Sequence, residues 1–145
     1  MIENLFSLKG RTALVTGGSR GIGKMIAHGF LESGAKVYIS SRKADACDET
    51  AAELSKYGKC ISLPQDVSTV AGCKALAEQI YKLENGKLDI LVNNAGAAWA
   101  ADFDEFPEQG WDKVMNLNVK SPFFLTQALH AALAKAASVE QPAKV

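Results

Sequence analysis

Short apolar runs alternate with longer segments of helical period along this chain. The apolar runs are rich in β-branched and aliphatic residues and cover 11–16, 36–41, 60–63 and 88–92, with 143–145 as the opening of a fifth. The segments between them predict helices over 22–34, 44–57, 68–84 (capped by Ser68) and 109–137 (interrupted near Pro122). Alternation of this kind predicts an α/β fold, a doubly wound parallel sheet with helices on both faces, truncated at the start of strand five.

Composition narrows the class of protein. The chain has 145 residues, of which 48% are hydrophobic and 22% charged, so we expect one domain over 1–145. Sixteen basic and sixteen acidic residues cancel, which argues against nucleic-acid and membrane partners. The chain has no bilayer-length apolar stretch and no secretion signal at residues 1–4, which predicts a cytoplasmic protein. Cys47, Cys60 and Cys73 form no C-x-x-C pair, so neither a disulfide framework nor a metal site is expected.

A glycine cluster joins the first apolar run to the first predicted helix. Glycines at this position allow a tight turn and let a pyrophosphate approach the backbone, while the helix start presents free amides. The residues predicted to bind a nucleotide cofactor here are Gly17, Ser19, Arg20, Gly21, Ile22 and Gly23.

The glycine turn has two other interpretations, a Walker-type phosphate loop and a purely structural turn. A Walker-type phosphate loop almost fits from Gly18 to Lys24, but Met25 stands where that loop needs a hydroxyl for magnesium. The strict dinucleotide-binding spacing G-x-G-x-x-G is also absent. A turn with a purely structural role remains the second alternative.

Four motifs, in order along the chain, resemble the short-chain dehydrogenase/reductase family. T-G-x-x-x-G-x-G begins at Thr16, Asp-Val stands at 66–67, Asn-Asn-Ala-Gly at 93–96, and a further asparagine at 118. The resemblance implies a Rossmann-type dinucleotide-binding domain whose remaining cofactor-binding residues include Asp66, Val67, Asn93, Ala95 and Gly96. It also implies that Asn118 has a structural and catalytic role, anchoring a proton-relay water. Residues 6–11 are similar to the 3-oxoacyl (β-ketoacyl) reductase branch.

The end of the second apolar run predicts which nicotinamide cofactor is bound. NAD-specific dinucleotide folds place an acidic residue there, whereas this chain has Ser41 followed by Arg42. A guanidinium fork suits the 2′-phosphate of NADP, and Arg20 is placed to reach the same group. We therefore include Ser41 and Arg42 in the site and predict NADP(H). The alternative is that Arg42 and Lys43 form a solvated loop.

The catalytic tyrosine and lysine that the resemblance implies have no counterpart in these residues. The family uses Tyr-x-x-x-Lys beyond the fifth strand, but Tyr38, Tyr57 and Tyr81 are followed four residues later by arginine, isoleucine and asparagine. We therefore expect the chain to be the N-terminal part only and inactive as given. His28 and His130 are interpreted as helix residues, and the acids at 102, 104 and 105 as a solvated loop.

Two hypotheses follow for the function. The first is an NADP(H)-dependent oxidoreductase that reduces a small-molecule carbonyl, with 3-oxoacyl thioesters favoured by the branch resemblance, to an alcohol. It is supported by the apolar strand at 88–92, which would be left as an unpaired edge. The second is a naturally short, non-catalytic nucleotide-binding or regulatory protein. The helix over 123–137 is expected to bury two faces, one of them in a homodimer or homotetramer by resemblance, with packing inside one chain as the alternative.

Overall fold

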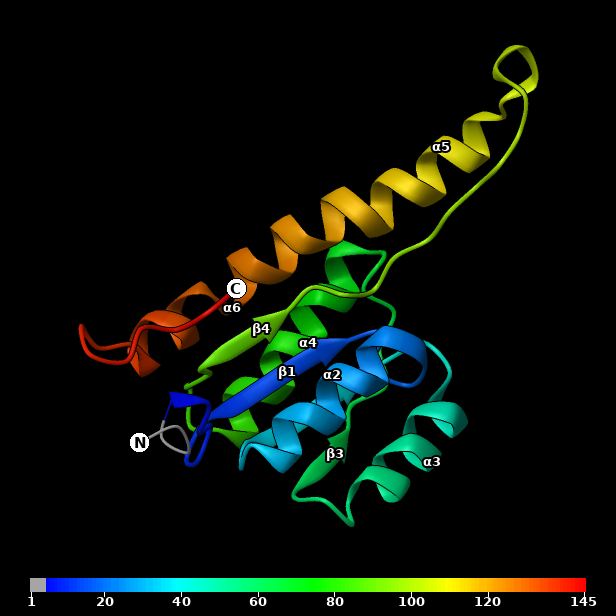
Figure 1. Cartoon of the computed structure of the whole chain (residues 1–145). Helices are drawn as coiled ribbons and strands as arrows, with labels where there is room; N and C mark the ends of the chain where they lie inside the picture. The colour runs from blue at the N-terminus through cyan, green and yellow to red at the C-terminus, as the bar shows by residue number, and fades with distance from the viewer. Residues whose placement is uncertain (1–4) are drawn as a thin grey trace.

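The computed structural model describes residues 5–145, so the first four residues, on which the prediction about a secretion signal rests, lie outside the described residues. It contains a four-stranded parallel sheet in the order β3-β2-β1-β4. The strands are β1 (Thr12–Thr16), β2 (Lys36–Ser40), β3 (Cys60–Ser62) and β4 (Ile90–Val92) (Figure 1). The order places the carboxyl ends of β1 and β4 side by side, at the reversal point where ligands bind in such sheets.

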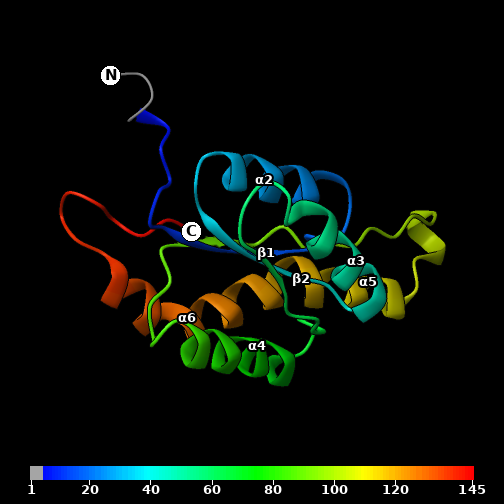
Figure 2. The ribbon, with the colours of Figure 1, turned by 90° about the horizontal axis from the view of Figure 1, so that it is seen from below.

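Helices cover both faces of the sheet, which confirms the predicted fold class. They are α2 (Gly21–Glu32), α3 (Ala44–Leu54), α4 (Val70–Leu83), α5 (Glu108–Met115) and α6 (Ser121–Ala136). Figure 2 shows α2 on one side of the strands and α4 with α6 on the other. Two separate hydrophobic cores result, because Ala13 and Val15 of β1 pack towards α2 and α3 while Leu14 packs towards α4 and α6. Burial on both faces explains why the strands are continuously apolar.

Two helix boundaries differ from the sequence prediction, and one agrees with it. The helix predicted over 44–57 ends at Leu54, where the chain turns towards β3. The cap of α4 is Thr69 instead of Ser68, because the Thr69 hydroxyl accepts from the Gly72 amide at 3.0 Å. The glycine stop after α2 is confirmed, since Gly34 has a φ of +94°.

The predicted interruption of the last long helix is present as a π-helical turn, η2 (Asn116–Lys120), between α5 and α6. Pro122 lacks the amide that would bond the carbonyl one turn back, so the regular ladder is broken just before it. Figure 1 shows α5 and α6 as one long rod, with α5 and the loop before it reaching beyond the sheet.

The segment 143–145 lies beside β4, as expected for the opening of a fifth strand. Lys144 forms a parallel bridge to Ile90, and its carbonyl accepts from the Leu91 amide at 2.9 Å. The outer edge of β4 is therefore partly paired, contrary to the unpaired edge expected from the sequence.

Only one face of α6 is buried within this chain, through Leu125, Leu129 and Leu133 against α4 and the sheet. Phe123 is 63% exposed on the same helix. Within residues 5–145 the face that carries Phe123 is therefore not covered, which speaks against the alternative of packing inside one chain, while its burial in a homo-oligomer stays a prediction. No helix within residues 5–145 is both long and apolar enough to cross a membrane.

Candidate functional site

The glycine turn between β1 and α2 lies at the carboxyl end of β1, directly beside the turn that follows β4. Gly17 adopts a φ of +67°, which favours glycine. Gly23 is required by close approach, because a Cβ there would lie 2.2 Å from the Gly17 carbonyl oxygen and 2.5 Å from the Asn94 side-chain nitrogen. The first turn of α2 therefore packs against the turn after β4 at a separation that admits no side chain.

A buried hydroxyl joins these two turns. Thr16 is 2% exposed, and its Oγ1 accepts from the backbone amides of Asn94 at 3.1 Å and Ala95 at 3.0 Å while donating to the Val92 carbonyl at 3.3 Å. The Asn94 side chain completes the connection by donating to the carbonyls of Thr16 at 3.1 Å and Gly17 at 3.3 Å. These five hydrogen bonds hold the two turns together.

The amino-terminal end of α2 is open to a ligand. Arg20 occupies the N-cap position in extended conformation and makes no side-chain capping bond. The first-turn amides of the helix and the positive end of its dipole are thus available to an anion. The carbonyl of Ser19 is held by the buried Thr50 hydroxyl of α3 at 2.8 Å, and Ile22 exposes its side chain beside the turn.

Side chains from four turns line a hollow of about 360 Å³ at this edge of the sheet. Of the predicted site residues it brings together Arg20, Arg42 and Gly96. The other residues that line it are Ser68, Ala97, Ala98, Lys113, Asn116 and Leu117. Ser41 directly follows β2 and precedes Arg42, and its hydroxyl donates to the Lys43 carbonyl at 3.3 Å. Among residues 5–145, no carboxylate lines this hollow.

Asp66 and Val67 follow β3 at the same edge. Val67 is buried in the core, and the exposed Asp66 carboxylate accepts from the Ser68 amide at 3.0 Å. Hydrogen bonding from Ser68 holds the pKa of Asp66 below its ordinary value, and the charge of Arg42 lowers it further. Asp66 is therefore an anion near Arg42 at neutral pH.

Asn118 lies in the π-helical turn and binds the segment after β4. Its Oδ1 accepts from the Ala97 amide at 2.8 Å and its Nδ2 donates to the Ala97 carbonyl at 2.9 Å. This pair of bonds holds η2, and α5 with it, against residues 96–97. The approach is close, because a Cβ at Gly96 would lie 3.3 Å from the Asn118 side-chain oxygen. π-turns of this kind occur often at functional sites, because they redirect one side chain of a helix.

Asn93, also predicted to bind the cofactor, directs its side-chain nitrogen to the Thr126 hydroxyl of α6 at 3.2 Å. Ala95 donates its backbone amide to Thr16 instead. Both residues thus hold the turn after β4 in place.

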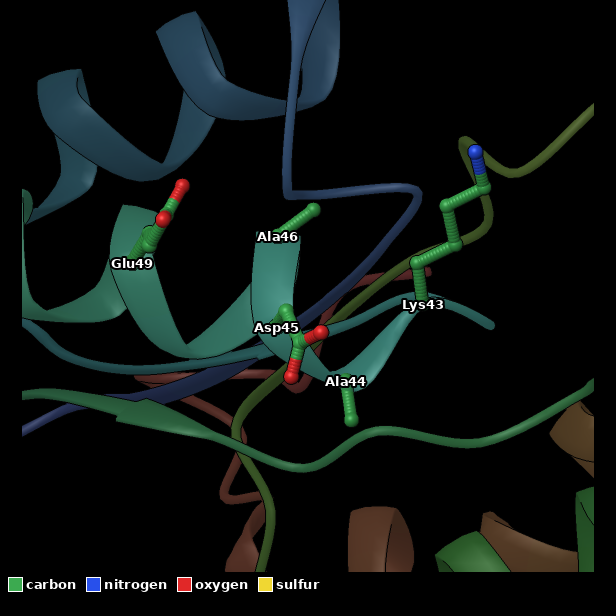
Figure 3. A pocket seen from close by; sticks show the side chains of 5 residues that line it. All are labelled: Lys43, Ala44, Asp45, Ala46 and Glu49. Carbon is green, nitrogen blue, oxygen red and sulfur yellow. The ribbon is translucent and has the colours of Figure 1, made fainter.

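Another hollow lies at the start of α3, lined by Lys43, Ala44, Asp45, Ala46 and Glu49 (Figure 3). Lys43 projects away from the carboxylates of Asp45 and Glu49, so the polar groups do not converge on one point. This surface has no set of groups suited to a phosphate.

The three tyrosines are all engaged elsewhere. The Tyr38 hydroxyl is buried and donates to Glu84, and burial raises the pKa of Tyr38. Tyr81 accepts from the Ala132 amide at 3.2 Å, and Tyr57 stacks on His28 with ring centroids 4.0 Å apart. None of them stands at the carboxyl edge of the sheet, in agreement with their rejection as catalytic residues.

Other residues considered from sequence also have structural roles. Lys24, the lysine of the near-Walker pattern, pairs with Glu53 at 2.6 Å and is thereby held away from a phosphate at the turn. The acids at 102, 104 and 105 lie exposed around the 3-10 helix η1 (Phe103–Glu105). Cys47, Cys60 and Cys73 are free and buried, and burial raises the pKa of Cys60 to about 11. Across the described part of the chain, no group of three or more metal-ligating side chains occurs.

Several residues of the site were not among the predicted site residues. Six of them line the hollow: Ser68, Ala97, Ala98, Lys113, Asn116 and Leu117. Three others, Thr16, Asn94 and Thr50, hold the turns in place. Thr16 and Asn94 belong to the recognised motifs, so their position was the available signal. Thr50 lies 31 residues from its partner Ser19 and shows no local pattern that would indicate the contact.

Comparison with known proteins agrees with this geometry. The family model described as short chain dehydrogenase matches residues 11–139. The chain is 54% identical over 140 residues to the rhamnolipids biosynthesis 3-oxoacyl-[acyl-carrier-protein] reductase of Pseudomonas aeruginosa, covering 97% of this chain and 54% of that protein. It is 42% identical over 133 residues to the 2-dehydro-3-deoxy-D-gluconate 5-dehydrogenase of Dickeya dadantii, covering 89% and 50% of the two chains.

Solved structures show the same relationship. The Pseudomonas aeruginosa RhlG/NADP active-site complex superposes with a TM-score of 0.92 at 54% identity, covering 95% of this chain and 54% of that one. The L-sorbose reductase of Gluconobacter frateurii, complexed with NADPH and L-sorbose, gives a TM-score of 0.83 at 30% identity over 90% and 50% of the two chains. The chain thus spans about half the length of the relatives it matches. By the match of its sequence over 11–139, this chain belongs to the short chain dehydrogenase family.

Proposed function

We propose that residues 1–145 form the dinucleotide-binding domain of an NADP(H)-dependent oxidoreductase that reduces a carbonyl to an alcohol. The observation that carries the proposal is the pairing of an open helix start at Arg20 with a second arginine, Arg42, over one hollow. The relative at 54% identity is a 3-oxoacyl reductase by name, which supports 3-oxoacyl thioesters as the substrate class.

The residues present suit this cofactor. The close packing at Gly23 and the uncapped amides of α2 provide a site for the pyrophosphate. Arg20 and Arg42 supply positive charge for a 2′-phosphate, and Asp66 and Val67 match the adenine-side motif of the family by their position after β3. When bound, the dinucleotide supplies the hydride for the reduction.

These residues contribute to the chemistry by holding parts of the site in position. The Asn118 side chain holds η2 against Ala97 through two hydrogen bonds to the Ala97 backbone. These bonds fix the position of η2 on the side of the site opposite the glycine turn. Residues 1–145 contain no Tyr-x-x-x-Lys. We therefore propose that these residues alone bind the cofactor without turnover, and that Asn118 takes part in catalysis together with the serine, tyrosine and lysine of the longer protein.

Cofactor preference tests this proposal directly. We expect tighter binding of NADPH than of NADH, measured by isothermal titration calorimetry. Arg42→Asp should weaken NADPH binding roughly 10- to 100-fold, because it replaces a charge-assisted phosphate contact by repulsion. NADH binding should change little. Equal affinity for the two cofactors in the unmodified protein would contradict the proposal, and Arg42 would then belong to a solvated loop.

The non-catalytic alternative is separated from the reductase by two measurements on the protein purified from its own cells. An intact mass near 15.4 kDa, that of these residues alone, would favour the alternative. A larger mass with NADPH oxidation in the presence of a 3-oxoacyl thioester or another small carbonyl would support the reductase.

We further propose that the longer protein is a homodimer or homotetramer that uses the exposed face of the α5–α6 rod. Trp111 is 60% exposed, Val119 54% and Phe123 63%, and all three belong to this rod. Large exposed apolar side chains on one element favour a protein contact. Gel filtration in which the longer protein elutes as a monomer would contradict this assembly. The cytoplasmic location stays a prediction from the sequence.

A further inference from the structure

Three cations converge on the hollow at the edge of the sheet. Arg20, Arg42 and Lys113 all line it, and within residues 5–145 none of them forms an ion pair. Arg11, Lys24 and Lys36, by contrast, form ion pairs with Asp89, Glu53 and Glu84. Like charges gathered around one hollow repel one another, so an anion bound there is favoured.

Lys113 reaches this hollow from the helix that faces the glycine turn. Lys113, Asn116 and Leu117 stand three and four residues apart, which places them on one face of α5 and η2, and all three line the hollow. The two bonds between Asn118 and Ala97 hold this part of the rod against the turn after β4. The side chain therefore approaches the two arginines from a separate and anchored element.

The stem of Lys113 is positioned by an aromatic contact. Its ammonium lies 5.4 Å from the centre of the Trp99 ring, and Trp99 packs on Gly110, where a Cβ would lie 2.7 Å from the indole Cγ. A cation–π contact orients the ammonium while leaving its charge in place. Trp99 thus keeps Lys113 at the rim of the hollow, and Gly110 makes room for Trp99.

We propose that Lys113 is a third binding residue for the 2′-phosphate of NADP(H), acting with Arg20 and Arg42 from the α5 side. The inference rests on the proposed cofactor. A phosphate monoester carries about −1.5 to −2 charges near neutral pH. Part of the Arg42 charge is offset by the neighbouring Asp66 carboxylate, whose pKa Arg42 lowers. A third cation compensates for that offset and favours NADPH over NADH.

The test is calorimetric binding of NADPH and NADH to the full chain and to Lys113→Met, which keeps an unbranched apolar stem against Trp99. We expect NADPH binding to weaken about five- to tenfold and NADH binding to stay within about twofold, as for one solvent-facing charge contact. Lys113→Arg should retain most of the affinity. Lys120→Met is the matched control, because Lys120 is exposed on the adjoining π-turn and is not among the residues that line the hollow.

Adenosine 2′-monophosphate and adenosine 5′-monophosphate serve as probes of the same contact. Loss of affinity for the 2′-isomer alone supports the assignment. Equal losses for both isomers, or for both dinucleotides, would place Lys113 at another group and overturn it. An unmodified protein without preference for NADPH refutes the proposed cofactor itself, whereas preference retained in Lys113→Met refutes only the role of Lys113.

Discussion

Replacing Gly23 by alanine is expected to abolish measurable NADPH binding and to destabilise the fold by about 1–3 kcal/mol, the usual cost of overpacking. The added methyl would lie 2.2 Å from the Gly17 carbonyl oxygen, and backbone cannot rotate away as a side chain does. Either the first turn of α2 or the glycine turn at Gly17 must move, and the Asn94 side chain must shift as well. Movement of either one separates the uncapped amides of the helix from the position that a pyrophosphate would occupy.

Gly29→Ala is the matched control for this change, because Gly29 lies in the same helix and a Cβ there meets no atom within 4 Å. It should stabilise the protein by about 0.5–1 kcal/mol through helix propensity. Urea denaturation measures the stability of both variants, and calorimetry measures their affinity for NADPH. If Gly23→Ala binds NADPH with wild-type affinity, the packing of the two turns does not matter for the site.

Replacing Thr16 by valine is expected to lower the free energy of unfolding by about 1–3 kcal/mol, because the part-buried Ala95 amide loses its acceptor. The Asn94 amide loses one of two acceptors and keeps the Val92 carbonyl at 3.1 Å. Valine has nearly the same shape as threonine but no oxygen. The turn after β4 should loosen with respect to the glycine turn, and NADPH affinity should fall with it.

Thr16→Ser restores the hydroxyl and serves as the control, with an expected loss well below that of valine. Denaturant midpoints at equal slope report the difference in stability between the two variants. Equal midpoints for serine and valine would show that the hydroxyl does not hold the turns together.

Much of the fold was predictable because it depends on short-range pattern. Short apolar runs with helical segments between them predict a parallel sheet covered on both faces, and the observed parallel strands and the core on each face agree with that prediction. The last helix was harder, because its π-turn depends on Pro122 and on the bonds of Asn118 to a segment about 20 residues away. The cap at Thr69 differed by one residue from the prediction, since neighbouring hydroxyls in a loop look alike in sequence.

The candidate site also contains some residues that local sequence predicts and others that it does not. Glycine spacing and the arginine after β2 could be recognised locally, because each reflects the conformation or charge of a few adjacent residues. Thr50 could not, because its bond to Ser19 depends on how α3 packs beside the glycine turn. Lys113 could not either, since nothing in an exposed helix lysine distinguishes one that lines a hollow from one that is only solvated.

The sequence by itself determined the α/β alternation, the glycine turn and the basic character of the segment after the second strand. Each of these depends on residue types within one element and on the burial pattern they require. Only the tertiary structure decided that Thr16 and Asn94 join two turns and that Lys24 forms an ion pair with Glu53. It also decided that Arg20, Arg42 and Lys113 line the same hollow. Those contacts connect residues up to about 90 positions apart. They depend on how the helices pack on the sheet, so no local pattern in the sequence indicates them.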